Sequence, residues 1–220
     1  MSRRTFLDAL GTSLAFEKPP QRIISLIPSV TELLFALGLD ERIVGVTKFC
    51  THPPEGVAKK EKIGGEKNPD LQKILALNPD LVIANVEENR REDVEALKMA
   101  GVPVFVTYPR TVEGGIALIR QLGALTSTWQ AAEGIARPIE EIYQETLALT
   151  KGKRPTRVFC PIWRRPYMTI NQDTYVHDMI RVCGGENIFE DHPERYPQVT
   201  LEEVEELRPE IILLPDEPYP

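Results

Sequence analysis

Short apolar runs alternate with amphipathic stretches along the first half of the chain. The runs RIISLI, RIVGV, DLVIA and VPVFVT have the length and the β-branched content typical of buried strands. Helical spacing of apolar residues follows them at 29–38, 70–76, 90–100 and 112–124. This alternation predicts βαβ units on a parallel sheet, so the predicted fold class is α/β.

The first of these helices has the clearest boundaries. Its apolar face consists of Val30, Leu33, Leu34 and Leu37. Ser29 and Glu32 stand at the spacing of a capping box, and Gly38 marks the end. The Ser29 hydroxyl is therefore predicted to cap its own helix, although its place after a strand also makes it a candidate ligand donor.

The stretch 129–150 has no strand pattern. Its more apolar residues recur at alternating steps of three and four: Ala132, Ile135, Ile139, Ile142, Thr146 and Leu149. This spacing predicts one amphipathic helix on the order of 33 Å long, which Pro138 can bend. The strand pattern resumes at RVFCPI, so this helix is predicted to link two regions.

The second region repeats part of the first. Residues 201–213 match 71–83 without a gap at an offset of 130 (201 − 71), and each copy reads as a capped helix, a proline and a buried strand. Such a repeat predicts two similar lobes. We assign 1–125 to the first lobe, 126–152 to the linking helix and 153–220 to the second lobe.

At the N-terminus, Asp8 and Gly11 interrupt the apolar stretch that an export signal needs. The segment TFLDALGTSLAF, two short apolar runs around a glycine-containing turn, instead predicts a hairpin.

Composition narrows the function. The net charge of −7 disfavours a nucleic-acid surface, and no apolar run reaches the roughly 18 residues that span a bilayer. Three cysteines without C-x-x-C spacing do not predict a disulfide framework. Cys183 shares a helical stripe with Ile180 and is predicted to be buried, whereas His177 and His192 are predicted to be solvated.

Ligands of open parallel sheets bind beyond the carboxyl ends of the strands. In the first lobe these ends carry Ser29, Phe49, His52, Glu87, Glu88, Tyr108 and Arg110, and in the second Trp163, Arg164, Arg165, Asp216 and Glu217. A tryptophan beside two arginines suits a planar or anionic ligand. Glu87 and Glu217 are equivalent under the 130-residue offset and, with His52, are candidate ligands for a cation; an ordinary solvated loop is the alternative for all three.

Several stretches together resemble the class III substrate-binding proteins of ABC importers, and most closely their cobalamin-binding branch. They are RIISLIPSVTELLFALGL, IGGEKNPDLQKILALNPDLVIAN, RVFCPIWRRPYMTI, CGGENIFED and YPQVTLEEV. The resemblance implies two α/β lobes joined by one long helix, with cobalamin or another metal chelate bound between them and no intrinsic cofactor. It also implies a monomer that delivers its ligand to an ABC permease with its ATPase.

The same resemblance assigns roles to individual positions. Phe49 and Trp163 fall where the cobalamin binders place aromatic side chains against the ligand, and Glu66 stands where they commonly have another aromatic. Glu202 matches the acidic residue that docks the second lobe to the permease. The matching first-lobe position is Gln72, with Asp70 as the nearest acid.

Two other functions remain open at this stage. One is a metal-dependent hydrolase using Glu87, Glu217 and His52, although the chain lacks G-x-G-x-x-G, P-loop, G-x-S-x-G and H-E-x-x-H motifs, so we expect no enzyme. The other is a cytoplasmic sensor or carrier. The resemblance implies a periplasmic or cell-surface protein, but we recognise no signal peptide in this chain, so we expect a cytoplasmic protein if the chain is complete. The second lobe is also expected to be shorter than is usual in the family.

Overall fold

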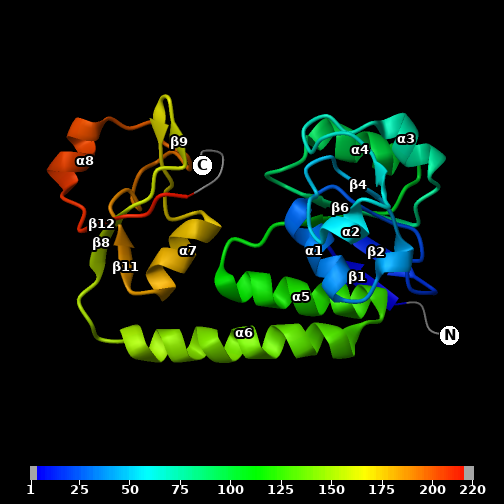
Figure 1. The fold of residues 1–220 in the computed structure, drawn as a ribbon, viewed down its shortest axis with the longest axis horizontal. Coiled ribbons are helices and arrows are strands. Elements are labelled where there is room, and N and C mark those ends of the chain that lie inside the picture. Colours follow the sequence, from blue (N-terminus) through cyan, green and yellow to red (C-terminus); the bar gives the residue numbers. More distant parts are fainter. Residues whose placement is uncertain (1–3, 216–220) are drawn as a thin grey trace. The chain divides into compact units, whose positions relative to one another are not determined.

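The computed structural model describes residues 4–215 (Figure 1). The elements follow in this order: β1 Arg4–Leu7, β2 Ser13–Phe16, β3 Ile23–Ser25, α1 Pro28–Ala36, the 3-10 turn η1 Asp40–Arg42, β4 Ile43–Val46, α2 Pro54–Val57, β5 Glu61–Lys62, α3 Leu71–Ala76, β6 Leu81–Asn85, α4 Arg91–Met99, β7 Val104–Thr107, α5 Val112–Thr126, α6 Trp129–Thr150, β8 Thr156–Phe159, β9 Trp163–Arg164, β10 Tyr167–Met168, α7 Tyr175–Val182, β11 Gly185–Asn187, α8 Leu201–Leu207 and β12 Ile211–Ile212. The predicted α/β class is confirmed.

The chain divides into two compact units. Unit 1 holds the chain up to Tyr108 together with Leu118–Ile135, and unit 2 holds Pro109–Ala117 and the chain from Ala136 onward. The division falls inside both α5 and α6. The lobe boundaries drawn from the sequence at 125 and 152 remain predictions.

Unit 1 is built on a five-stranded parallel sheet in the order β5-β4-β3-β6-β7. Successive residues of its central strands enter different cores: Leu81 and Ile83 pack with α1 and α5 on one face, whereas Val82 and Ala84 pack with α3 and α4 on the other. Because helices cover both faces, the strands read as continuous apolar runs. The predicted hairpin is confirmed as the antiparallel pair β1–β2, which meets β7 through the bond from the Ala9 amide to the Val106 carbonyl.

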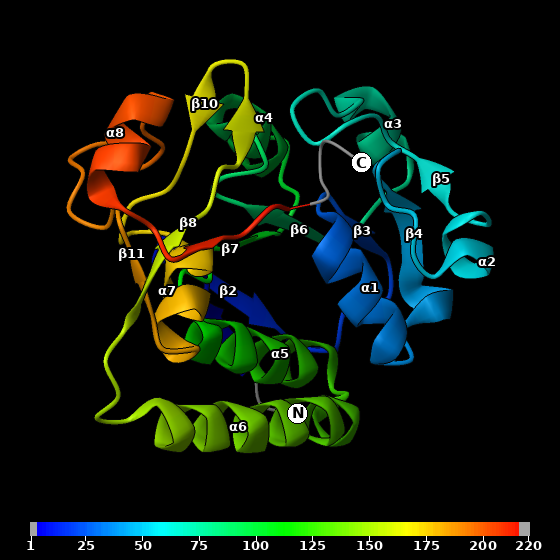
Figure 2. The same ribbon diagram turned by 60° about the vertical axis from the view of Figure 1, so that its left-hand side comes forward.

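The helix predicted over 129–150 is confirmed as α6, which continues through Pro138. In unit 1, α5 and the start of α6 lie side by side (Figures 1 and 2). They pack tightly at Gly123, where an added Cβ would lie 2.2 Å from the Ala132 Cβ. Within the described residues, no helix combines the length and apolarity required to span a membrane.

Unit 2 contains the three-stranded parallel sheet β11-β8-β12 and the antiparallel hairpin β9–β10. Val158 packs with Ile180 of α7, and the next residue, Phe159, packs with Val204 of α8. The prediction that 211–213 form a buried strand is wrong about burial. Ile211 and Ile212 are 45% and 56% exposed, because β12 is hydrogen-bonded only to β8 in the described part of the sheet.

The structure corrects the predicted start of the first helix. The helix α1 begins one residue earlier, with Pro28 in its first turn and Ile27 as N-cap, and no side chain caps it. Proline needs no hydrogen-bond partner there, and its φ is already helical. Ser29 consequently lies inside the first turn rather than before it, and the capping box is wrong. The positive φ of Gly38 follows the helix as expected.

Two predictions about α7 are also wrong. The helix ends at Val182, so Cys183 falls outside the helical stripe and is exposed. His177 is half-buried, its Nδ1 atom is buried without a hydrogen-bond partner among the described residues, and burial lowers its pKa. The three cysteines are free, as expected.

Candidate functional site

Every strand of the unit 1 sheet is parallel, so all five carboxyl ends meet at one edge. The loops at this edge carry the candidates Ser29 after β3, Phe49 after β4, Glu66 after β5, Glu87 and Glu88 after β6, and Tyr108 after β7. The sheet thus brings six sequence-predicted residues to one edge of one unit. Ser29 and Glu88 are exposed, and Glu87 and Tyr108 are half-buried.

Phe49 presents the largest apolar surface at this edge. Its side chain is 53% exposed, and the Lys48 ammonium lies 4.9 Å from the ring centroid. The ring packs against Gly65, where an added Cβ would lie 3.2 Å from Phe49 Cε2. An exposed ring with a cation beside it is suited to stack on a flat, partly apolar ligand.

Behind Phe49 lies a buried polar cluster that sequence reasoning missed. The Cys50 thiol lies 3.2 Å from the hydroxyls of both Thr31 and Thr47, and the Thr47 hydroxyl donates to Glu66 Oε1 at 3.0 Å. Glu66 itself is only 8% exposed. The cluster joins three segments: Thr31 in α1, Thr47 and Cys50 in the loop after β4, and Glu66 in the loop after β5. No sequence motif links these segments, so only their packing could reveal the cluster.

Asn89 ties three of the loops together. Its Nδ2 donates to the carbonyls of Leu26 at 3.3 Å and Glu66 at 3.1 Å, and its Oδ1 accepts from the Asn85 amide at 2.8 Å. The loop after β6 is further held by Lys67, which donates to the Glu87 carbonyl. Asn89 is buried, so this arrangement fixes the loops that carry Ser29, Glu66 and Glu87.

The structure gives the Ser29 hydroxyl no hydrogen-bond partner among the described residues. The helix start is stabilised by Thr31 instead, whose hydroxyl donates to the Ile27 carbonyl at 2.9 Å. The correction at α1 therefore leaves Ser29 able to donate to a ligand.

In unit 2, the candidate aromatic residue lies on a short hairpin. Trp163 pairs with Met168 and Arg164 with Tyr167, which places Arg165 in the turn. The indole N–H of Trp163 donates to the Arg165 carbonyl at 3.1 Å, and Trp163 remains 44% exposed. Arg164 and Arg165 are exposed, and the hairpin projects away from α6 (Figures 1 and 2). The hairpin thus combines an aromatic surface with two guanidinium groups.

A second group of arginines in unit 2 was not predicted as a group. Asp173 accepts from Arg110 at Oδ1 and from Arg195 at Oδ2, the latter at 2.8 Å, and Arg195 lies over the Tyr196 ring at 5.4 Å. Arg110, which the sequence placed in the first lobe, belongs to unit 2. The position of Asp173 directly before the N-cap Thr174 was the only sequence signal.

Of the three proposed cation ligands, only His52 and Glu87 lie among the described residues. His52 is exposed and its Nδ1 lies 3.0 Å from the Thr51 hydroxyl, while Asp216 and Glu217 lie outside the described residues. Across residues 4–215, no three His, Cys, Asp or Glu side chains form a group that could hold a metal ion. Glu87 and Glu217 as a pair therefore remain a prediction.

The predicted docking positions occupy equivalent places in the two units. Gln72 and Glu202 are both exposed second residues of their helices, α3 and α8. The Asp70 carboxylate is the N-cap of α3 and accepts from the Lys73 amide at 3.0 Å. Unit 1 thus presents an amide where unit 2 presents a carboxylate, and the docking roles remain predictions.

A vitamin B12-binding protein of Pectobacterium carotovorum is 32% identical over 201 residues, which are 90% of this chain and 72% of that protein. The crystal structure of the periplasmic vitamin B12-binding protein BtuF of Vibrio cholerae superposes with a TM-score of 0.81 at 28% identity, covering 89% of this chain and 76% of that one. The periplasmic heme-binding protein RhuT from Roseiflexus superposes with a TM-score of 0.76 at 28% identity, covering 88% and 76%.

The family model described as periplasmic binding protein matches residues 23–217, which include both parallel sheets and α6. The fold is that of the class III members, as the resemblance implied. The matched relatives and structures are named as binding proteins. The chain belongs to the periplasmic binding protein family.

Proposed function

We propose that this protein is the substrate-binding component of an ABC importer and that its ligand is cobalamin or a similar metal chelate. The observation that carries the proposal is the match to vitamin B12-binding proteins over nine-tenths of the chain. The heme-binding relatives support the broader class of chelate.

The contact surfaces agree with such a ligand. Phe49 beside Lys48 in unit 1, and Trp163 beside Arg164 and Arg165 in unit 2, are exposed aromatic rings next to cations. A corrin or porphyrin offers a large flat surface for stacking and polar groups at its rim, and these side chains suit both. Ser29 adds a hydroxyl donor at the unit 1 edge.

We propose that the exposed acidic side chains of α8 dock the protein to a permease. The first turn of this helix carries the carboxylates of Glu202 and Glu203, and Glu205 and Glu206 follow in the next turn. Exposed acidic side chains of this kind steer association with a basic partner surface. In unit 1, Gln72 at the equivalent place would contribute a hydrogen bond rather than a charge.

Calorimetric titration tests the proposal. The protein is titrated with cyanocobalamin, hemin, a ferric siderophore, and iron and zinc salts, and each ligand is recovered and analysed by chromatography. We expect saturable binding of at least one chelate, recovered chemically unchanged, and a raised melting temperature in its presence. Formation of a product would favour a hydrolase. Binding of a free metal ion, but of no chelate, would contradict the proposal that the ligand is a metal chelate.

A further inference from the structure

Glu66 is a carboxylate whose charge has no counter-ion among the described residues. In residues 4–215, the one donor to this carboxylate is the Thr47 hydroxyl, which bonds to Oε1, whereas the Asn89 side-chain amide donates to the backbone carbonyl of Glu66. The lysines around Glu66 make other contacts: Lys67 donates to the Glu87 carbonyl, Lys62 donates to the Cys50 carbonyl, and Lys48 lies over the Phe49 ring. With 8% of its surface exposed, Glu66 keeps only a narrow contact with water.

This position makes Glu66 sensitive to what covers it. It lies at the carboxyl edge of the unit 1 sheet, one residue after Gly65, against which the exposed Phe49 ring packs. A ligand stacked on Phe49 would displace the remaining water from Glu66. A buried carboxylate that loses its water without gaining a donor is strongly destabilising, and a second carboxylate nearby adds repulsion.

Ligands at this edge therefore differ by the polar groups they carry. A chelate decorated with carboxamides presents N–H groups that replace the lost water at Glu66. A chelate decorated with free carboxylates presents only acceptors of like charge. Selectivity of this kind arises from rejection of the wrong ligand as much as from attraction of the right one.

We propose that Glu66 determines the ligand class of this protein, admitting amide-bearing chelates such as cobalamins and rejecting carboxylate-bearing ones such as haem. The inference rests on the proposed function, because it concerns the same ligand-binding edge. In this proposal Glu66 discriminates between ligands, and Phe49 stacks on the ligand ring.

The first test needs no mutation. Hemin with two free propionates and its dimethyl ester differ in charge but share the ring and the metal. The wild-type protein should bind the ester at least tenfold more tightly than hemin, and it should bind cyanocobalamin more tightly than either. Equal affinity for the acid and the ester would overturn the role of Glu66.

The second test compares Glu66→Gln with the control Glu41→Gln. Glutamine keeps the size of Glu66 and an acceptor oxygen but removes the charge, so hemin affinity should rise about tenfold while cyanocobalamin affinity changes less than threefold. Glu41 is an exposed residue of η1, before β4, and its variant removes the same charge from the opposite edge of the sheet. Its hemin to cyanocobalamin ratio of dissociation constants should stay at the wild-type value.

The outcomes separate the two proposals. Suppose that the wild type binds cyanocobalamin, but that the ratio of the hemin to the cyanocobalamin dissociation constant in Glu66→Gln stays within twofold of the wild-type ratio. The specificity role is then wrong and the importer function stands. If the wild type prefers hemin, the specificity role is again wrong. If the wild type binds neither cyanocobalamin nor hemin, the specificity role is wrong; if it binds no ferric siderophore either, the proposed function fails as well.

Discussion

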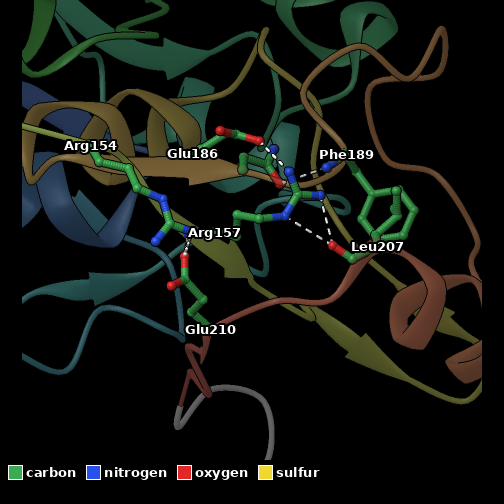
Figure 3. Close-up of polar contacts among 7 residues, drawn as sticks. Arg154, Arg157, Glu186, Phe189, Leu207 and Glu210 are labelled. Carbon is green, nitrogen blue, oxygen red and sulfur yellow. Dashed lines mark hydrogen bonds and ion pairs between the residues drawn. The ribbon is translucent and has the colours of Figure 1, made fainter.

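Arg22 and Arg157 make the same pair of hydrogen bonds in the two units. Arg22 donates from Nε and Nη2 to the Leu77 carbonyl at 3.0 and 2.6 Å, and Arg157 donates from the same atoms to the Leu207 carbonyl at 3.0 and 2.7 Å (Figure 3 for Arg157). Leu77 is the C-cap of α3, Leu207 is the last residue of α8, and the two lie at the 130-residue offset (207 − 77). Each arginine thus satisfies the last carbonyl of the repeated helix.

The acidic partners repeat as well. Asp80 accepts from the Arg22 amide at 2.8 Å, and Glu210 accepts from the Arg157 amide at 3.0 Å. The residues after the two leucines, Asn78 and Arg208, both have a positive φ. The repeat found in the sequence is therefore a repeat of hydrogen bonds, not only of residue types.

Removal of the Arg157 side chain should destabilise unit 2. Arg157→Ala leaves the Leu207 carbonyl and Glu186 without their donor, so the free energy of unfolding should fall by about 1 to 3 kcal/mol. Arg154→Ala is the control, because the ion pair of Arg154 with Glu210 is exposed and its loss should cost under about 1 kcal/mol. Urea unfolding measures both, and equal losses would contradict the capping role.

Trp163 should contribute to ligand binding without contributing to folding. Trp163→Ala should weaken chelate binding by about 1 kcal/mol or more in calorimetry, with an unchanged melting temperature. Trp129→Ala is the matched control, since Trp129 is also exposed but begins α6, away from the strand ends. Unaltered affinity in Trp163→Ala would remove the hairpin from the site.

Asn89 should affect both stability and affinity, because it joins the loops after three strands. Asn89→Ala removes the hydrogen-bond partner of the Leu26 and Glu66 carbonyls and of the Asn85 backbone N–H. The free energy of unfolding should therefore fall by about 1 to 3 kcal/mol, and ligand affinity should fall with it. Asn89→Asp keeps the acceptor for the Asn85 amide and loses both donors. Isothermal titration of folded Asn89→Asp should still show weakened binding; wild-type affinity would mean that the loops keep their places without those donors.

The contact of α5 with α6 in unit 1 predicts opposite effects for two glycines. Gly123→Ala should destabilise by about 1 to 3 kcal/mol, because its Cβ would overlap the Ala132 Cβ. Gly134→Ala should stabilise by about 0.5 to 1 kcal/mol, because Gly134 lies within α6 and nothing lies within 4 Å of an added Cβ. Thermal melts of the two variants should shift in opposite directions, and a shared direction would refute the close approach.

His177 predicts a loss of stability in acid. Burial is the largest influence and lowers the pKa of His177 below the ordinary 6.5. The negative charges of Glu190 and Asp178 raise this pKa by less, and the positive charge of Arg181 lowers it slightly further. As the pH falls through about 6.5, the unfolded chain therefore binds a proton that the folded chain does not, and the free energy of unfolding falls. Urea unfolding at pH 7.5 and 5.5 should show a smaller loss for His177→Gln than for the wild type. An identical loss would place the acid sensitivity elsewhere.

The strongest sequence predictions concerned local periodicity. The bounds of α6, the N-terminal hairpin and the repeated helices α3 and α8 follow from apolar spacing and turn residues, which act within a few positions of the chain. The errors concerned helix ends, where the local sequence was compatible with two positions of the helix boundary. Ser29 fits an N-cap by type, but Pro28 suits the first turn better, and the Cys183 stripe failed because the helix ended one residue before it.

The candidate site residues stay predictions, and the structure adds where they lie. Because parallel strands end at one edge, the residues after them could be named from the sequence. Phe49 lies exposed after β4 in unit 1, and Trp163 lies exposed on the β9–β10 hairpin in unit 2. The burial of Glu66, the three bonds of Asn89 and the bridge of Asp173 could not be named. Apart from the bond between Asn85 and Asn89, which are four residues apart, these contacts join residues about 20 or more positions apart, and no spacing rule encodes such contacts.

The sequence by itself determined which segments become helices and strands, and that a strand-end edge in each unit carries aromatic and charged residues, because hydrophobic periodicity and turn chemistry are local. The tertiary structure alone decided which of those residues are buried and what they bond. Burial depends on neighbouring elements: the same repeated strand is inaccessible as β6 between β3 and β7, and exposed as β12 beside β8.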